Sequence, residues 1–398
     1  MATKGRRQAN AVPSTSGKTP IIEESVPPEG SLQTSSIAVS GRGLVDCPPE
    51  ICERIFSFAC LDDGFTGRSL SLVSRYIHDT SVMVRYQSVV VEGFDQICAL
   101  AFLLEKKKPE RRLVRHLFLS HSRTPRPRKT SPRDPQSRLR LSSTKGAPAK
   151  SEESNDDFPL FCQSTYEQRI EAATRLCALI GSTVETMTII MPQSRDFLPI
   201  PVQFPALVEL TVYSVYCTTL PCNQVPQSLP SLQRLHLVGP YFRSPEISEL
   251  ALVAPSLTHL RFSGLEREIN VPRIVRRILG ASATTPTTDP PELQLRHPRI
   301  QKIFIRPRYP IFCGYGPSFG NYCLALENLQ ELAREFWGEE EVILLSPDEY
   351  LESTHDEQTR EAKRWWRARL EGRIGCWSDS GRLSYSQITC EGYLRSFV

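Results

Sequence analysis

The strongest constraint on the fold is an eight-residue pattern, Pro-x-Leu-x-x-Leu-x-Leu, that recurs along the middle of the chain. The first three clear copies follow one another at steps of 25 residues, and the fourth comes 43 residues after the third. Two weaker copies lack the proline and lie upstream. In chain order the six copies occupy residues 114–119, 184–189, 205–212, 230–237, 255–262 and 298–305.

A period of 20 to 29 residues with this apolar spacing is typical of leucine-rich repeats. One such unit cannot bury its apolar edge alone, so neighbouring units stack and build a shared core. The apolar-x-apolar part of each unit predicts a strand. We therefore predict an α/β fold in which residues 93–310 form an irregular leucine-rich-repeat solenoid, with parallel strands on one face and helices and loops on the other.

One helix of this solenoid is predicted between the first two copies. Ser164 and Glu167 have the spacing of a capping box, and apolar residues at helical spacing follow as far as Gly181. We expect this helix to back the sheet from the convex side. Its apolar positions are Tyr166, Ile170, Ala173, Cys177 and Ile180.

Strand alternation assigns the remaining strand residues to a solvent-facing concave surface. Three of the four clear copies carry Arg or Lys there, so an acidic or phosphorylated target is one hypothesis. A solvated face with no single ligand is the alternative. The residues predicted to bind a target are Tyr213, Arg234, His236, Arg261 and Arg306.

The N-terminal part divides into a polar leader and a helical segment. Residues 1–42 are rich in Ser, Thr, Pro and Gly, which predicts a disordered leader. Residues 43–92 predict a small helical module whose first helix opens at Pro48 and Pro49 after Asp46 as N-cap. Apolar stripes for that helix and two more are Ile51, Ile55 and Ala59; Leu70, Val73 and Ile77; and Val82 and Val84.

Residues 47–56, Cys-Pro-Pro-Glu-Ile-Cys-Glu-Arg-Ile-Phe, followed by Leu-Ser-Leu-Val-Ser-Arg at 70–75, resemble an F-box. The stretch at 62–70 and the tail at 366–377 are similar to those of F-box proteins common in mushroom-forming fungi. The segment departs from the family pattern in two ways. Cys47 stands where the family has leucine before the proline, and the loop between the helices is longer than average.

The resemblance implies a substrate receptor of an SCF-type (cullin–RING) ubiquitin ligase, which performs no bond chemistry itself. In that family the F-box docks on a Skp-family adaptor, and through it on a cullin, while the repeats present a protein target. The alternative for the apolar members of this set is the interior of the module. Carried over by position, the adaptor-binding residues are Pro48, Pro49, Ile51, Ile55, Leu70, Val73 and Ser74.

Charge is concentrated in one segment. The chain carries a net charge of +4, but residues 106–150 contain fifteen Lys or Arg and only two acids, so the remainder is negative. Residues 122–157, which overlap this segment, predict a disordered basic insertion. A repeat scaffold outside any ligase and a nuclear protein using this basic loop are therefore alternative functions. The basic insertion lacks aromatic residues that would stack on bases, which argues against direct nucleic-acid binding.

Cysteine and histidine spacing indicates neither a metal site nor an active site. The pairs Cys47/Cys52 and Cys217/Cys222 are each five residues apart, and no second pair follows at zinc-site spacing. We expect most of the 12 cysteines to be reduced, buried thiols, and we expect no cofactor. No apolar run reaches the length of a membrane span, so we predict a cytoplasmic or nuclear protein, or both.

The last part of the chain, residues 311–398, predicts a strand and a helix that cap the repeats. Residues 341–345 are the expected strand, and the helix is expected to begin at Ser346 and to stop at Gly372. Three tryptophans in this part, Trp365, Trp366 and Trp377, are expected to cover the end of the solenoid.

Overall fold

The computed structural model describes most of the chain from Leu44 to Thr389, and these residues belong to one compact unit. The predicted leader, the basic insertion, Ser164 and the first turn expected after Pro347 lie outside the described residues. The described ranges are 44–121, 166–191, 202–214, 216–217, 229–242, 250–265, 270–280, 297, 299–308, 317–338, 342–347 and 355–389.

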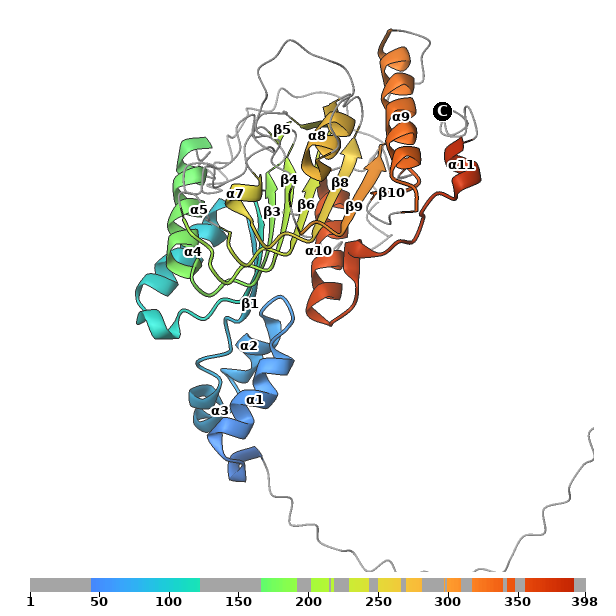
Figure 1. Ribbon diagram of the computed structural model, residues 1–398. Helices are drawn as coiled ribbons and strands as arrows, with labels where there is room; N and C mark the ends of the chain where they lie inside the picture. Colours follow the sequence, from blue (N-terminus) through green and yellow to red (C-terminus); the bar gives the residue numbers. More distant parts are fainter. Residues whose placement is uncertain are drawn as a thin grey trace, which may run out of the picture. The chain divides into compact units, whose positions relative to one another are not determined.

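An eight-stranded sheet, parallel throughout, is the centre of this unit (Figure 1). Its strands lie side by side in chain order, and two short strands, β5 (Tyr216–Cys217) and β7 (Tyr241–Phe242), pair separately. The strands of the large sheet are β1 (Ser88–Glu92), β2 (His116–Ser120), β3 (Thr186–Met191), β4 (Glu209–Ser214), β6 (Arg234–Val238), β8 (His259–Leu265), β9 (Lys302–Pro307) and β10 (Val342–Leu344).

Each copy of the repeated pattern contributes one strand, from β2 to β9, which confirms the predicted α/β fold. The strand expected at 341–345 is also present as β10. We did not predict β1, because its β-branched run Val89–Val90–Val91 lies within residues 43–92, which predict a helical module. Restricted χ1 rotamers favour such residues in strands, and this preference decides here.

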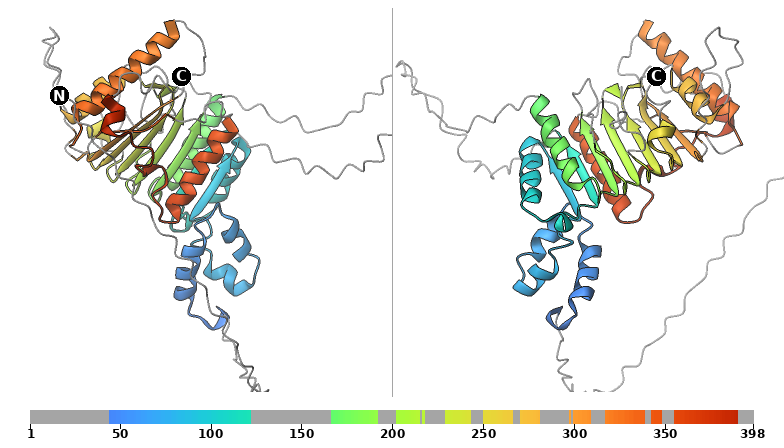
Figure 2. Two further views of the ribbon diagram at one scale, coloured as in Figure 1. Left: turned by 90° about the vertical axis from the view of Figure 1, so that its right-hand side faces the viewer. Right: turned by 60° about the vertical axis from the view of Figure 1, so that its left-hand side comes forward.

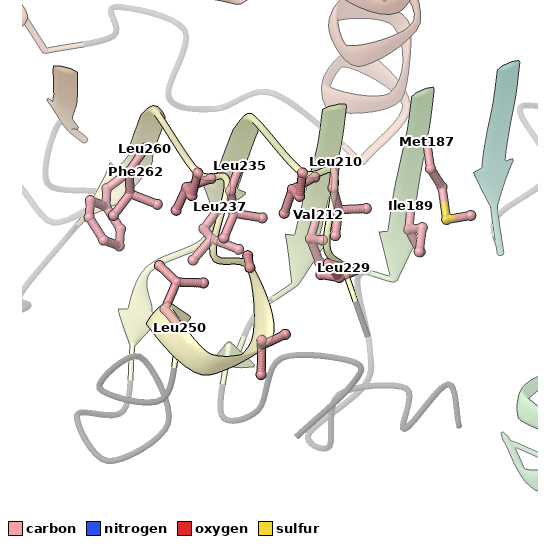
Figure 3. Packing of buried hydrophobic residues seen from close by; sticks show 14 of the residues in the cluster. Met187, Ile189, Leu210, Val212, Leu229, Leu235, Leu237, Leu250, Leu260 and Phe262 are labelled. Atoms are coloured by element: carbon pink, nitrogen blue, oxygen red, sulfur yellow. The ribbon is translucent and has the colours of Figure 1, made fainter. Parts of the chain in front are cut away.

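The apolar side chains of neighbouring repeats stack in two rows on one side of the sheet (Figure 3). Leu210 lies opposite Leu235 in register, and Leu235 lies opposite Leu260. Each of these side chains is at most 1% exposed. The second row, two residues further along each strand, consists of Val212, Leu237 and Phe262.

A backbone ladder joins the repeats just before each strand begins. The carbonyl of Gln233 accepts the N–H groups of both Thr258 and His259, each at 2.9 Å. The carbonyl of Val208 does the same for Gln233 at 2.9 Å and Arg234 at 3.1 Å. Because these polar groups are paired from one repeat to the next, the strands start in a common register.

Helices cover both faces of the sheet (Figures 1 and 2). On the face of the stacked leucines lie α4, α5, α7, α8 and α9, whose apolar residues belong to the same core. The helix predicted on that side is present as α5, ending one residue before Gly181. The bounds are α4 (Phe94–Glu105), α5 (Tyr166–Ile180), α7 (Leu250–Val253), α8 (Asn270–Leu279) and α9 (Pro317–Glu335).

The other face of the sheet carries α10 (His355–Leu370) and the short helix η4 (Gly375–Trp377). The helix ends near the predicted stop, where Gly372 adopts φ 76° and its N–H bonds the carbonyl of Arg369 at 3.0 Å. A last helix, α11 (Tyr385–Thr389), packs on α9. Of the segment expected to cap the repeats, β10 pairs with β9 at the end of the sheet, whereas α10 and η4 lie along one face of it.

The N-terminal helical module consists of the short helix η1 (Leu44–Asp46), α1 (Pro49–Ala59), α2 (Phe65–Leu70) and α3 (Arg75–Thr80). The second predicted helix, from Leu70 to Ile77, is wrong, because Ser74 caps α3 and interrupts it. Residues 81–86 form turns where the third helix was expected. The module has its own core of Cys52, Phe56, Cys60, Ile77 and Val84.

Candidate functional site: the outer face of the N-terminal helices

Helix α1 buries one face and exposes an apolar one. Cys52 and Phe56, one turn apart, point into the module core and are at most 2% exposed. Ile51, Ile55 and Phe58 are spaced i, i+4 and i+7, so they share a second face of the helix. Their exposed fractions are 48%, 45% and 68%. We call these three residues the α1 outer face.

The chain enters α1 through two exposed prolines. Pro48 is the N-cap, with φ −52° and ψ 141°, and Pro49 is the first helical residue, where the missing N–H costs no hydrogen bond. The Tyr76 hydroxyl donates to the carbonyl of Cys47, which ties this entry to α3. The prolines are therefore held at the surface beside the α1 outer face.

The α2–α3 turn exposes a second pair of apolar residues. Leu72 and Val73 are 86% and 68% exposed. Next to them, the Ser74 hydroxyl accepts the N–H of Ile77 at 3.2 Å and caps α3. Leu70 differs from the other residues predicted to bind an adaptor, because it packs against the module core.

Hydrogen bonds to Asp62 and a close backbone contact at Gly67 fix α2 and the loop that precedes it. The Asp62 carboxylate accepts the N–H groups of Gly64 at 3.0 Å and Thr66 at 2.8 Å. At Gly67, an added Cβ would lie 2.3 Å from the carbonyl oxygen of Arg85, so only glycine fits. These contacts hold α2 and the turn after it in one position.

The sheet face predicted to bind a target is covered by the chain's own C-terminal segment, α10 and η4. Trp366 packs edge-on against Phe118 with ring centroids 5.8 Å apart. Trp377 lies over Phe304 and His236 at 6.0 and 6.1 Å. Two of these rings are tryptophans that we expected at the end of the sheet. They instead fill its face, which is therefore not an open concave surface.

A buried polar network holds this segment in place. Glu209 on β4 accepts hydrogen bonds from the Trp377 indole at 2.9 Å and the Arg369 guanidinium at 2.8 Å, and pairs with Arg234 at 3.5 Å. Arg261 on β8 donates to the carbonyl of Cys376. Charged groups buried in this way need such partners, and here the sheet and the C-terminal segment supply them to each other.

The target-binding prediction requires correction for its central members. Tyr213, His236 and Arg261 are at most 6% exposed, so a protein target does not reach them. His236 bonds the Ser263 hydroxyl at 3.0 Å, and burial together with the charges of Arg261 and Arg306 holds its pKa well below the ordinary value. Alternation of side chains is correct here, but alternation does not reveal that another segment covers the polar side.

Two members of the predicted set stay partly accessible. The Arg234 side chain is 32% exposed and contributes to the Glu209 network. Arg306 is partly buried on β9. The structure does not gather these two with the rest of the set into one open patch, because the buried members lie between strands and the C-terminal segment.

Helix α10 also contacts the loop of the helical module, which the sequence did not suggest. The Asp63 carboxylate pairs with Arg367 and, at 3.5 Å, with Lys363, and Lys363 pairs with Glu92 at 3.1 Å. Burial acts to raise the pKa of Asp63, but its hydrogen bonds and the charges of Arg367 and Lys363 outweigh burial and lower it. The carboxylate is therefore ionised in the folded chain at neutral pH.

Among the described residues, no group of three or more His, Cys, Asp or Glu side chains is placed to hold a metal ion. In the described ranges, no helix is long and apolar enough to cross a bilayer.

Comparisons with protein-family models, with curated proteins and with solved structures each found no match to this chain. The candidate site therefore depends on the chain's own geometry. The α1 outer face, the exposed prolines and the α2–α3 turn form the candidate docking site.

Proposed function

We propose that this protein is a substrate receptor of an SCF-type ubiquitin ligase. In this proposal, residues 43–92 act as an F-box that docks on a Skp-family adaptor, which in turn joins a cullin. The repeats act as an irregular leucine-rich-repeat body for the receptor, with α10 and η4 lying on its strand face. The protein works in the cytoplasm, the nucleus or both.

One observation carries the proposal: a small helical module leaves large apolar side chains uncovered on a defined face. Ile51, Ile55 and Phe58 follow one helical stripe, yet each is at least 45% exposed. Covering such a half-exposed side chain contributes on the order of 1 kcal/mol. An exposed apolar face beside two surface prolines supports docking by a second protein.

The proposed interface includes most of the residues that the F-box resemblance indicates. Pro48, Pro49, Ile51, Ile55, Val73 and Ser74 are exposed, and Leu70 supports them from below. Phe58 and Leu72 join the proposed interface on the strength of their exposure.

The proposed activity is a gain in proximity. A receptor that holds its target and the ubiquitin-charged enzyme in one assembly raises their effective concentration to about millimolar. Tyr213, His236 and Arg261 are not part of the proposed target surface, because the C-terminal segment covers them. The role of the basic insertion in nuclear import stays a prediction, which deletion of residues 122–157 and imaging would test.

Co-purification of the full-length chain with a Skp-family adaptor tests the proposal. Ile51→Asp combined with Ile55→Asp places two carboxylates in the proposed interface, so we expect adaptor capture to fall at least 100-fold. Phe102→Asp is the matched control, because Phe102 is 57% exposed on α4, away from this face. Equal capture by all three proteins, or no capture by the unmodified chain, would contradict the proposal.

A further inference from the structure

Two cysteines meet at the start of α1. Since Pro48 is the N-cap, Cys47 takes the position before the cap and Cys52 the fourth helical position. Side chains at these two positions commonly pack together and set the direction in which the chain enters a helix. Cys47 packs against the core cluster that contains Cys52, and the Cys52 thiol donates to the backbone carbonyl of Cys47 at 4.0 Å.

The two thiols differ in access. Cys47 is half-buried, so a small reagent reaches it, while Cys52 is fully buried. The Cys52 sulfur lies 3.5 Å from the carbonyl of Leu44, 4.0 Å from that of Cys47 and 3.8 Å from the Tyr76 hydroxyl. The half-buried Cys47 therefore lies next to the fully buried Cys52.

We propose that Cys47 and Cys52 are a redox-modification site, at which a peroxide converts the pair into a reversible disulfide across the start of α1. The site lies where the F-box pattern has leucine in place of Cys47, so the chain keeps the apolar packing and gains a reactive pair. The bond closes a loop that contains only Pro48, Pro49, Glu50 and Ile51 between its ends.

The chemistry balances without a metal or cofactor. The Cys47 thiolate attacks hydrogen peroxide, forms a sulfur–oxygen bond and releases one water, which leaves a sulfenic acid. The Cys52 sulfur then attacks the Cys47 sulfur, forms the disulfide and expels the second water. Two thiols are oxidised by two electrons while one peroxide is reduced to two waters. Thiol exchange with reduced thioredoxin or glutathione reverses the step.

The surroundings of Cys47 slow disulfide formation at neutral pH. Burial and the neighbouring Cys52 raise the pKa of the Cys47 thiol above its ordinary value, so little thiolate is present. Because the thiolate is the nucleophile, the rate of disulfide formation should rise about 10-fold per pH unit below that pKa.

The regulatory consequence rests on the proposed adaptor docking. A disulfide at this point fixes the entry of the chain into α1 and with it the exposed prolines. Fewer conformations must then be ordered when an adaptor binds, so release from the adaptor should slow about 3-fold.

Peptide mass analysis of the peroxide-treated full-length chain tests the site, because trypsin cuts after Arg42 and Arg54 and leaves both cysteines in one peptide. After treatment at native pH, alkylation and digestion, we expect this peptide unalkylated and about 2 Da lighter, with recovery after thioredoxin. Cys98, which is half-buried and distant in sequence, reports general oxidation. The Cys47→Ser variant should leave Cys52 as a thiol.

Three results would overturn the proposal. They are a Cys47 that stops at sulfenic or sulfinic acid with Cys52 still alkylated, a pair that stays reduced while Cys98 is oxidised, and a bond between two molecules. These results do not depend on an adaptor. Capture by the reduced chain tests the proposed function separately, and an unchanged release rate from the adaptor after disulfide formation would end the regulatory role.

Discussion

The helical module exposes apolar side chains, whereas the strand face of the sheet buries charged ones. On α1, Ile51, Ile55 and Phe58 are left in solvent, whereas on the sheet the charged Glu209 and Arg261 are buried. The same chain covers a polar face with its own C-terminal segment and leaves an apolar face bare. Helix α10 contacts the adjacent loop at Asp63 but leaves the α1 outer face exposed. In the proposed function, the apolar face is the one that a partner covers.

The comparison also shows what side-chain periodicity can establish. A period of 3.6 residues in a helix or two in a strand divides the element into faces. It does not show which segment, if any, covers each face. In the sheet the covering partner is the segment from α10 to η4, which begins about 90 residues after β8 ends. For α1, no described residue of the chain provides it.

The largest effect on folding is expected from Glu209→Ala. The substitution leaves the Arg369 guanidinium and the buried Trp377 indole without their acceptor, so we expect a loss of about 3 kcal/mol in the free energy of unfolding. Ile55→Ala on the α1 outer face should change it by less than about 0.5 kcal/mol. Denaturant titration measures both.

Glu185→Ala is the matched control for that comparison. Its carboxylate pairs with Arg115 at 2.7 Å, but both side chains are more than 30% exposed, so the loss should stay below about 1 kcal/mol. If Glu209→Ala costs no more than Glu185→Ala, the C-terminal segment is not held by a buried network.

Acid should loosen the sheet face through its buried histidines. Burial lowers the pKa of His116 to about 4 and that of His236 well below the ordinary value. The unfolded chain takes up these protons near pH 6.5 while the folded chain does not, so stability is full above that pH. It then falls towards the folded pKa, by about 2 kcal/mol per histidine between pH 6.5 and 5.

Unfolding midpoints at pH 7.5 and pH 5 check this expectation. His236→Gln keeps a donor and an acceptor near Ser263 but carries no titratable ring. The variant should therefore lose less stability than the unmodified chain over the same pH interval. Equal losses would show that His236 takes up its proton without disturbing the face.

A small effect is expected where the two regions meet. Asp63→Asn removes the charge that pairs with Lys363 and Arg367 while keeping the side-chain shape. Because the pairs are partly exposed, the loss should be about 0.5 to 1 kcal/mol and should shrink in high salt. Denaturant titration at low and high salt would measure it, and a loss that does not change with salt would contradict an ionic contact.

Sequence alone predicted the sheet better than the helices around it. The strands follow from the repeated leucines, and α5 follows from a clear apolar stripe. Helix α4 was missed because its sequence, Phe94–Glu105, is apolar almost all round and gives no stripe. Helix α10 was expected to start near Ser346, but where it packs depends on contacts such as Trp366 with Phe118, which no local pattern contains.

The candidate site was predicted in part for the same reason. The prolines and the α1 stripe stand out in the sequence, and they are exposed in the structure. The division of that stripe into an inner face at Cys52 and Phe56 and an outer face at Ile51 and Ile55 depends on how α1 packs on α3. The predicted target residues failed because a distant segment buries them.

Hydrogen–deuterium exchange of the full-length chain with and without a Skp-family adaptor tests directly whether the α1 outer face and the α2–α3 turn dock on the adaptor. We expect the adaptor to slow exchange in α1 and in the α2–α3 turn, with little change in the strands β2 to β9. Slowed exchange confined to the repeats, or an unchanged α1 in a chain that binds the adaptor, would contradict it.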